Sequence, residues 1–397
     1  MNKLSIDDLD LKNKKVLVRV DFNVPIEKGK ITDDTRIYAS LPTIKKILSD
    51  QGKAIIISHL GRPKGKQPEF TLKPVAQRLS QLLGREVKFV EDCIGPEVEK
   101  AIEQIKFGEC ILLENLRFYP EEEKNDSAFA QKLASLANLF VNDAFGTAHR
   151  AHASTAGVTQ FFKHNAAGYL MQKEIYYLSM ILSNPKKPFL TILGGAKVSD
   201  KINVIENLIS QKNVNLDGLL IGGGMAFTFI KALGGEIGES MFEKESLETT
   251  KNIFELAKIK NIRIMLPEDC AVEEENHSKS IQNSFRIPAG AKGLDIGPKT
   301  LEKFSQAINS AKTILWNGPL GVFEREEFAL GSIQMAHRLA YATSNGAVTV
   351  IGGGDTIAVI NQAKVADKLT HISTGGGASL EFLEGKELPG IKTLSDK

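Results

Sequence analysis

The sequence predicts an α/β protein of two domains, each built on a doubly wound parallel sheet. Short apolar runs rich in Ile, Val and Leu alternate with amphipathic segments. The runs are continuous rather than alternating, as expected for parallel strands that are buried on both faces. A chain of 397 residues is also too long for one ordinary core. The expected strands are Val16–Val20, Ala54–Ile57, Ile111–Leu113, Leu139–Val141, Phe189–Leu193, Leu219–Ile221, Ile262–Leu266, Thr313–Trp316 and Val348–Ile351.

The amphipathic segments between these runs are expected to form the crossover helices of right-handed β–α–β units. We expect a domain boundary near residues 170–188, where the helical stretch Leu170–Leu182 has no strand close by and is followed by a joint rich in proline and lysine. Each half then holds about five strands. The charged segment Pro120–Asp126 is expected to be a solvated loop. The clearest helical segments are Thr71–Leu83, Ser127–Ala137, Leu247–Ile259 and Glu326–Ala342.

Composition excludes several classes of protein. The net charge of +2 gives no global field that would attract nucleic acid or a membrane. No stretch approaches about 18 consecutive apolar residues, so no membrane-spanning helix is expected. The first residues have neither an apolar signal core nor an arginine-rich transit character, and we expect a cytoplasmic protein. The three widely spaced cysteines, without a CxxC pair, favour a reducing compartment over a disulfide framework or a zinc site.

Glycine runs in the second half mark one expected ligand site. Ligands of open α/β sheets bind at the carboxyl ends of strands, where glycine lets a ligand approach the backbone and helix-start amides attract anions. One run could be a simple tight turn, but four on one sheet are hard to explain by packing alone and indicate a nucleotide. The P-loop pattern GxxxxGK[ST] is absent. The runs are Gly194–Lys197, Gly222–Met225, Gly352–Asp355 and Gly375–Ala378.

Two lysines and one aspartate belong with these glycines. Lys197 and Lys201 lie four residues apart at the expected start of a helix and would share one face. Because a cation at a helix N-terminus opposes the helix dipole, the pair indicates a bound anion; the alternative is a solvated charged turn. Asp355 is the expected Mg²⁺ ligand, since Mg²⁺ on phosphates takes one or two carboxylates, and it could also cap the next helix.

Arginines at strand ends mark a second expected site, in the first half. Arginine suits planar, bidentate capture of phosphate and carboxylate. Any single arginine could form a surface ion pair, but several strand ends converge on one rim of a sheet. Asp21 and Asn23, after the first strand, could accept hydrogen bonds from substrate hydroxyls. The histidines of this half could serve as donors to phosphate or carboxylate, or pack in the core, and no carboxylate lies at metal-ligand spacing. The residues are Arg19, Arg36, Arg62, Arg117, Arg150, His59, His149 and His152.

Eight segments resemble phosphoglycerate kinases and occur in the order and spacing of that family over nearly the whole chain. The stretch His152–Gly157 and the overall length are similar to the bacterial form. The segments are Arg19–Pro25, Ser58–Pro63, Leu113–Phe118, Asp143–His152, Gly194–Lys201, Trp316–Pro319, Gly352–Thr356 and Ser373–Ser379.

The resemblance implies two Rossmann-like domains that face each other across a hinged cleft. The first would be residues 1–170, to which the tail at about 385–397 returns, and the second residues 171–384, beginning with an interdomain helix. It implies a monomeric glycolytic enzyme that transfers a phosphoryl group reversibly between Mg·ATP and the carboxylate of 3-phosphoglycerate, by direct in-line transfer after domain closure. The products would be 1,3-bisphosphoglycerate and ADP.

The resemblance also assigns roles to residues. The 3-phosphoglycerate would be held by Asp21, Asn23, Arg36, His59, Arg62, Arg117 and Arg150. The nucleotide would be held by Gly194, Lys197, Lys201, Gly222, Gly293, Asn317, Pro319, Glu324, Gly352, Gly353, Gly354, Asp355 and Thr356, with Glu324 on the ribose and Asp355 on Mg²⁺. Phosphoryl transfer depends mainly on positioning and electrostatics, so we expect catalysis from Arg36, Lys197, Lys201 and the amides of Gly375 and Gly376.

Two other functions are weighed against this one. An NAD-dependent dehydrogenase would use one glycine turn but would leave the arginines and the paired lysines unexplained. A non-catalytic binding protein of the same fold would be favoured by loss of Arg36 or Lys201, and both are present.

Overall fold

The computed structural model describes residues 2–211 and 213–397. The chain divides into two compact units. Unit 1 comprises the residues up to Tyr176 together with Glu387–Lys397, and unit 2 comprises Tyr177–Lys386. The division falls inside helix α6 (Tyr169–Ser183).

Unit 1 is built on a six-stranded sheet in the order β5-β6-β4-β1-β7-β8, and every pair of neighbours is parallel. Strand β1 lies in the interior of the sheet, and its apolar run is buried. Ligand sites of such sheets lie where the strand order reverses, which here is between β1 and β7. The strands are β1 (Lys15–Val20), β4 (Lys53–Ile57), β5 (Lys88–Val90), β6 (Cys110–Leu113), β7 (Leu139–Asp143) and β8 (Asn165–Ala167). A short hairpin, β2 (Ile26–Glu27) with β3 (Lys30–Ile31), follows β1.

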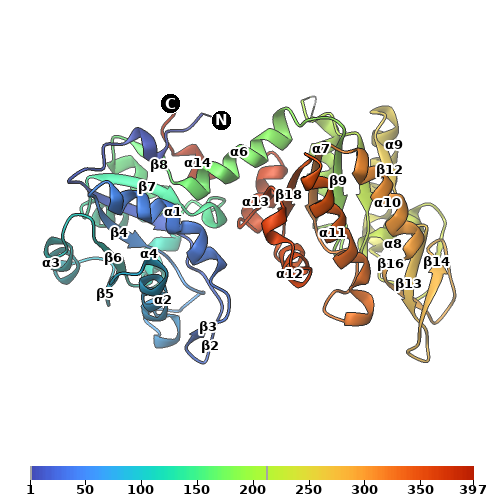
Figure 1. Ribbon diagram of the computed structural model, residues 1–397, viewed down its shortest axis with the longest axis horizontal. Helices are drawn as coiled ribbons and strands as arrows, with labels where there is room; N and C mark the ends of the chain where they lie inside the picture. Colours follow the sequence, from blue (N-terminus) through green and yellow to red (C-terminus); the bar gives the residue numbers. More distant parts are fainter. Residues whose placement is uncertain (1, 212) are drawn as a thin grey trace. The chain divides into compact units, whose positions relative to one another are not determined.

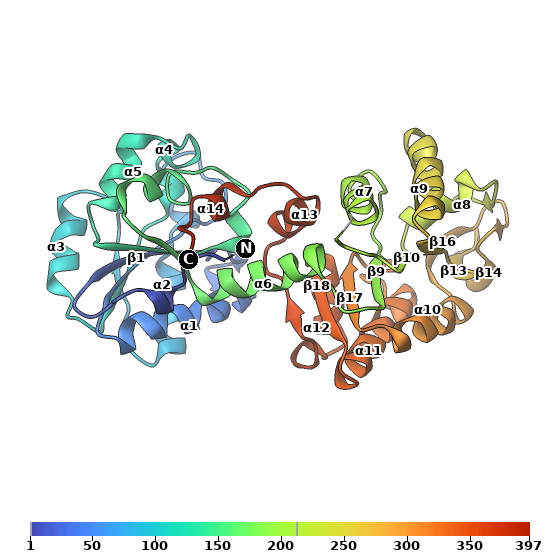
Figure 2. The same cartoon turned by 90° about the horizontal axis from the view of Figure 1, so that it is seen from above.

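Helices cover both faces of this sheet (Figures 1 and 2). Alternate side chains of β1 divide between two cores: Val16 and Val18 pack with α1 and α2, and Leu17 packs with α3 and α5. Two short helices, α4 and α14, complete the unit, and the α14 segment returns to it through a hydrogen bond from Gly390 N to Ala148 O (2.8 Å). The helices are α1 (Thr35–Ser49), α2 (Lys73–Leu83), α3 (Pro96–Gln104), α4 (Pro120–Glu123), α5 (Ser127–Ala134) and α14 (Pro389–Lys392).

Unit 2 is built on a second six-stranded parallel sheet, in the order β12-β10-β9-β17-β18-β19. When only the six strands of this sheet are numbered, this is the order 3-2-1-4-5-6 of doubly wound nucleotide-binding folds, and its reversal lies between β9 and β17. The strands are β9 (Phe189–Leu193), β10 (Gly218–Ile221), β12 (Arg263–Met265), β17 (Thr313–Asn317), β18 (Val348–Gly352) and β19 (His371–Ile372).

The helices of unit 2 form two layers. Helices α10, α11 and α12 pack on one face around the buried Trp316, and α7, α8 and α9 lie on the other (Figure 2). Helix α13 packs against α7. The helices are α7 (Ile202–Ser210), α8 (Met225–Ala232), α9 (Leu247–Ile259), α10 (Pro298–Ser310), α11 (Leu330–Ser344), α12 (Gly354–Gln362) and α13 (Gly377–Leu383). An antiparallel sheet of β14 (Lys279–Asn283), β13 (Asp269–Glu273) and β16 (Lys292–Ile296) and a pair of β11 (Glu236–Ile237) with β15 (Arg286–Ile287) are added at one end.

The nine strands expected from the apolar runs are all present, and each sheet has one strand more than the five expected. The solvated loop expected at Pro120–Asp126 is wrong: the segment begins with α4, and Glu122 is fully buried. The statement that no strand lies close to Leu170–Leu182 is also wrong, because β8 ends at Ala167. Among the described residues, no helix is long and apolar enough to cross a membrane.

Candidate functional site

In unit 1 the basic side chains gather where the central strands end. Arg19 lies in β1, His59 follows β4, Arg117 lies in the turn after β6, and Arg150 follows β7. Since the carboxyl ends of parallel strands share one edge of the sheet, these residues come from four neighbouring strands to one place. We call Arg19, Arg36, Arg117 and Arg150, together with His59, the arginine cluster.

The contacts of His59 show how closely the residues of the arginine cluster approach one another. It is 3% exposed, and its Nδ1 lies 3.2 Å from Nη2 of Arg19 and 4.0 Å from Oδ1 of Asp21. Burial lowers the pKa of His59 well below its usual range, and positive charges nearby add to that shift. The charges belong to Arg19, Arg117, Arg36 and Arg150. His59 is therefore neutral near pH 7 and lies in a positive field suited to an anion.

Asp21 and Asn23 shape the loop after β1. Arg36 donates to Oδ2 of the buried Asp21 at 2.8 Å, which fixes a guanidinium at the start of α1. Oδ1 of Asp21 accepts from the backbone N of Asn23 (3.1 Å), and the Asn23 side chain accepts from Gly61 N (2.9 Å). These contacts link the loops after β1 and β4 into one rim.

The buried guanidinium of Arg117 is only partly satisfied by hydrogen bonds within the described chain. Its side chain is buried, and Nη1 donates to the carbonyl of Gly61 at 2.7 Å. Nε lies 3.1 Å from Oε1 of Glu123 without the alignment of a hydrogen bond, and Nη2 has no protein acceptor within the described ranges. Because buried guanidinium donors are nearly always satisfied, Nη2 indicates an anion that binds there.

Other expected residues of this half differ in their placement. Arg62 follows β4 but is exposed, and within the described chain no ion pair or hydrogen bond joins it to the cluster. Arg150 Nε donates to Nε2 of His149 at 3.1 Å. Burial, with Arg117 and other positive groups, lowers the pKa of His152 to about 4, so this side chain is also neutral near pH 7.

Two buried residues next to the cluster were not expected from the sequence. Ser154 Oγ accepts from Nε of Arg19 at 2.8 Å and donates to Oε1 of Glu122 at 2.5 Å. The backbone N of Ser154 donates to Oε2 of Glu122 at 2.9 Å. Glu122 lay in a charged run and Ser154 in an ordinary small-residue stretch; only the motif position of Ser154, two residues after His152, could have directed attention to it.

In unit 2 three strand-end turns pack on one another at the reversal of strand order. The backbone N atoms of Gly194 and Gly195, after β9, donate to the carbonyls of Asn317 (3.0 Å), the last residue of β17, and of Pro319 (2.8 Å), two residues further on. Gly223 N, after β10, donates to Leu320 O at 3.1 Å. The expected glycine turns are therefore brought together at the position where doubly wound sheets bind ligands.

The glycines of these turns serve two different purposes. A Cβ at Gly194 would lie 2.1 Å from Pro319 O, and one at Gly293 in β16 would lie 2.1 Å from the ring of Phe227. Gly222 is similarly closed by Leu320. Packing thus accounts for Gly194 and Gly222. At Gly354 a Cβ would meet nothing within 4 Å, so this turn keeps open space at a helix start.

Lys201, in the segment after β9, contacts β17 across the point where the strand order reverses. It is the N-cap residue of α7, and its ammonium donates to Oδ1 of the buried Asn317. Burial lowers the pKa of Lys201, while Asp200, Asp355 and Glu384 oppose that shift. Nδ2 of Asn317 has no acceptor within the described ranges, which leaves a buried donor beside the lysine.

The expectation that Lys197 and Lys201 share a helix face is wrong. Helix α7 begins only at Ile202, so Lys197 lies in the preceding loop and is exposed. The glycine turn and a stretch of bends and turns separate β9 from the helix. Lys197 contributes to lowering the pKa of Glu243, whose carboxylate accepts from Ser199.

The position of Asp355 suits the role of Mg²⁺ ligand that is expected of it. It is exposed in the first turn of α12, and its charge acts on Lys201. No group of three or more His, Cys, Asp or Glu within the described residues could hold a metal ion. A single carboxylate is nevertheless enough when phosphate oxygens and water complete the shell. The neighbouring Thr356 is buried, and its Oγ1 accepts from Gly318 N at 2.7 Å, which ties the α12 start to β17.

The remaining expected residues lie on separate segments of unit 2. Glu324 is exposed in the loop after β17. Gly376 is the N-cap of α13 with a φ of 53°, and Gly375 N donates to Ser373 Oγ at 3.2 Å. The Gly375 amide therefore already has a protein acceptor.

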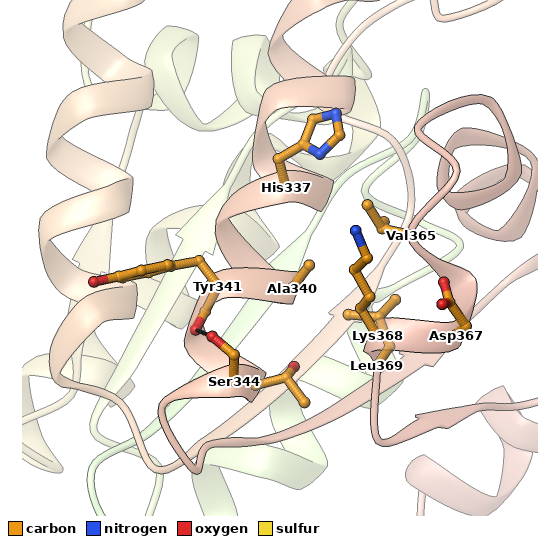
Figure 3. A pocket seen from close by; sticks show the side chains of 9 residues that line it. His337, Ala340, Tyr341, Ser344, Val365, Asp367, Lys368 and Leu369 are labelled. Atoms are coloured by element: carbon orange, nitrogen blue, oxygen red, sulfur yellow. Dashed lines mark hydrogen bonds between the residues drawn. The ribbon is translucent and has the colours of Figure 1, made fainter.

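Unit 2 also has an open pocket of about 530 Å³. Figure 3 shows the side chains that line it. His337 and Tyr341 of α11 line it together with Lys368. The last turn of α11 leads into the amino end of β18, so the pocket lies at the opposite edge of the sheet from the glycine turns. It contributes no residue of the candidate site.

Two Rossmann-like units, one with an arginine cluster and the other with glycine turns around a lysine, define an α/β phosphotransferase of the two-domain class. The phosphoglycerate kinase family model matches residues 6–386. The chain is 55% identical to phosphoglycerate kinase of Dictyoglomus turgidum over 99% of this chain and 98% of that protein. It is 53% identical to the enzyme of Clostridium tetani over 100% and 98% of the two chains.

Solved structures agree with the sequence relatives. Phosphoglycerate kinase from Coxiella burnetii superposes with a TM-score of 0.88 at 41% identity, and the match covers 98% of each chain. The enzyme from Pyrococcus horikoshii gives 0.84 at 35% identity, again over 98% of each chain. The chain belongs to the phosphoglycerate kinase family and is a transferase that carries out the phosphoglycerate kinase reaction.

Proposed function

We propose that the arginine cluster of unit 1, apart from the fully buried Arg19, binds 3-phosphoglycerate and that the glycine turns of unit 2 bind the nucleotide. The observation that carries this assignment is the buried Arg117, whose Nη2 lacks a protein acceptor in the described chain while three other arginines converge beside it on His59. A small polyanion supplies the acceptor that Nη2 of Arg117 lacks.

The proposed nucleophile is the substrate carboxylate, which is already ionised near pH 7 because such groups titrate near about 4. The reaction therefore needs no general base. This agrees with the neutral state of His59 and His152, whose pKa values are lowered by burial and by neighbouring arginines. The work of unit 1 is to hold and neutralise an anion that would otherwise repel the nucleotide.

In unit 2 we propose that Lys201 and the unpaired Nδ2 of Asn317 contact the nucleotide phosphates at the reversal point, and that Lys197 approaches from the preceding loop. Asp355 would hold Mg²⁺, which when bound neutralises phosphate charge. Gly354 leaves room for the phosphates at the start of α12. Arg36, Lys201 and the amide of Gly376 would stabilise the charge of the transferring group.

Direct transfer requires the two bound substrates to meet, so we propose that the two units close during turnover and exclude water from the acyl phosphate. We further propose that the chain acts as a monomer in the cytoplasm. Small-angle scattering with both substrates bound should show a smaller radius of gyration than either binary complex; an unchanged radius would contradict closure.

The assignment is tested by measuring ADP formation from Mg·ATP with and without 3-phosphoglycerate. We expect turnover only when the acid is present. Arg62→Ala is a suitable variant because the side chain is exposed and its loss should not disturb folding. It should raise the KM for 3-phosphoglycerate and leave the KM for ATP unchanged, whereas the exposed Arg338→Ala should change neither. An Arg62→Ala effect confined to ATP would mean that the units are assigned the wrong way round.

A further inference from the structure

A buried chain of hydrogen bonds runs from Glu122 to the imidazole of His59. Ser154 Oγ donates to Glu122 Oε1 (2.5 Å) and accepts from Arg19 Nε (2.8 Å). Nη2 of Arg19 lies 3.2 Å from Nδ1 of His59. Glu122, Ser154 and Arg19 are fully buried, so water does not compete for these contacts.

The direction of each hydrogen bond follows from the donors available. A guanidinium carries only N–H donors, so Ser154 Oγ must accept from Arg19 and give its own proton to the carboxylate. For the same reason Nδ1 of His59 must accept from Arg19. An imidazole whose Nδ1 accepts carries its proton on Nε2.

Other groups around His59 do not offer a competing arrangement. Asp21 Oδ1 lies 4.0 Å from Nδ1, too far for a hydrogen bond. The remaining charges that face the ring belong to Arg36 of α1, Arg117 after β6 and Arg150 after β7, and all are positive. Each of them disfavours a second proton on the ring.

We propose that Glu122, Ser154 and Arg19 are positioning residues that hold His59 as the neutral, Nε2-protonated tautomer, so that His59 offers one N–H donor to the substrate. Arg19 lies wholly inside the protein and acts through His59 rather than on the ligand. Glu122 supplies the buried negative charge that balances Arg19. Through Ser154, which accepts from Nε of Arg19, Glu122 also fixes the orientation of the Arg19 guanidinium group.

This inference rests on the proposed substrate role of His59 and adds to it the reason for its protonation state. Burial raises the pKa of Glu122, but Arg19 and two hydrogen bonds from Ser154 oppose that shift. The carboxylate thus has what an internal charge requires, namely an opposite charge and satisfied lone pairs.

The direct test is the tautomer of His59 in the full-length wild-type protein, read from imidazole ¹⁵N chemical shifts between about pH 5 and 8. We expect Nδ1 to stay unprotonated and Nε2 to stay protonated through this range. A proton on Nδ1, or a ring that becomes doubly protonated within it, would overturn the proposal whatever the variants do.

Ser154→Ala then tests the chain itself, because it breaks the link while leaving Arg19 and Glu122 in place. We expect His59 to lose the single tautomer and the KM for 3-phosphoglycerate to rise about tenfold, as is common when a supporting partner of a site residue is removed. The KM for ATP should be unchanged. Ser135→Ala is the control, since that exposed hydroxyl donates to Lys132 O at the end of its own helix.

An unchanged tautomer and an unchanged KM in a folded Ser154→Ala protein would refute the positioning role. His59→Gln separates this failure from failure of the proposed function. If His59→Gln leaves the KM for 3-phosphoglycerate as it was, the substrate assignment is wrong; if it raises the KM while Ser154→Ala does not, only the hydrogen-bond chain is wrong.

Discussion

The Gly354→Ala substitution tests most directly whether a glycine in these turns serves packing or nucleotide binding. Gly354 is the first residue of α12, and a Cβ there would meet nothing within 4 Å. Replacing glycine by alanine in an unstrained helix should therefore stabilise folding by up to about 1 kcal/mol. For a unit of this size that corresponds to a rise in Tm of about 2–4 °C.

The same methyl group would occupy the space in which we propose that the nucleotide phosphates approach. We expect the KM for ATP to rise about tenfold, equivalent to about 1.4 kcal/mol of binding free energy. The KM for 3-phosphoglycerate, which we propose binds on the other unit, should not change. The measurements are steady-state kinetics with each substrate varied, together with thermal unfolding.

Gly194→Ala is the matched opposite case. Its Cβ would lie 2.1 Å from Pro319 O and 2.7 Å from Gly318 O, and backbone atoms must move to admit it. Overpacking of this kind costs about 1–3 kcal/mol, so Tm should fall by several degrees. If Gly354→Ala left the KM for ATP unchanged, or if Gly194→Ala left Tm unchanged, the division of the glycines into two purposes would be refuted.

Two further predictions concern single side chains. Lys201→Ala should lower kcat by about 10²- to 10³-fold, the usual effect of removing one preorganised electrostatic contact, and near-normal turnover in the folded variant would remove its proposed role. Asp143 is fully buried, and burial raises its pKa to about 6. The folded protein therefore keeps a proton that the unfolded chain loses above about pH 4, and stability is lost as the pH rises through 6. Asp143→Asn does not titrate, so the stability of the wild type relative to this variant should fall by about 1 kcal/mol between pH 5 and 7 in denaturant unfolding; a constant or rising difference would contradict the shift.

Much of the fold could be predicted because buried parallel strands leave continuous apolar runs. Phe189–Leu193 and Leu247–Ile259 have the expected bounds in the structure. Strand β14 escaped prediction because it is a solvent-facing hairpin strand whose positions alternate between exposed and half-buried, with one isoleucine among polar residues. Strands β8 and β19 are too short to give a pattern.

The residue types of the candidate site could be predicted from the sequence, but the buried residues that hold them in position could not. Arg117 and Arg150 could be placed because each follows an expected strand, and strand ends converge. Glu122 could not, because its burial depends on Arg19 and Ser154, which lie far away in the sequence and are brought together only by folding. The shared helix face expected for Lys197 failed because a spacing of four residues indicates proximity only inside a helix, and α7 starts after Lys201.

The central claim is that each unit binds one substrate. A crystal structure with 3-phosphoglycerate and Mg·ADP bound tests it most directly. We predict the acid phosphate against Arg36, Arg117 and Arg150, and the nucleotide phosphates beside Lys201 and Gly354. An acid bound to unit 2, or a nucleotide whose phosphates lie away from the β9 and β17 turns, would contradict the account.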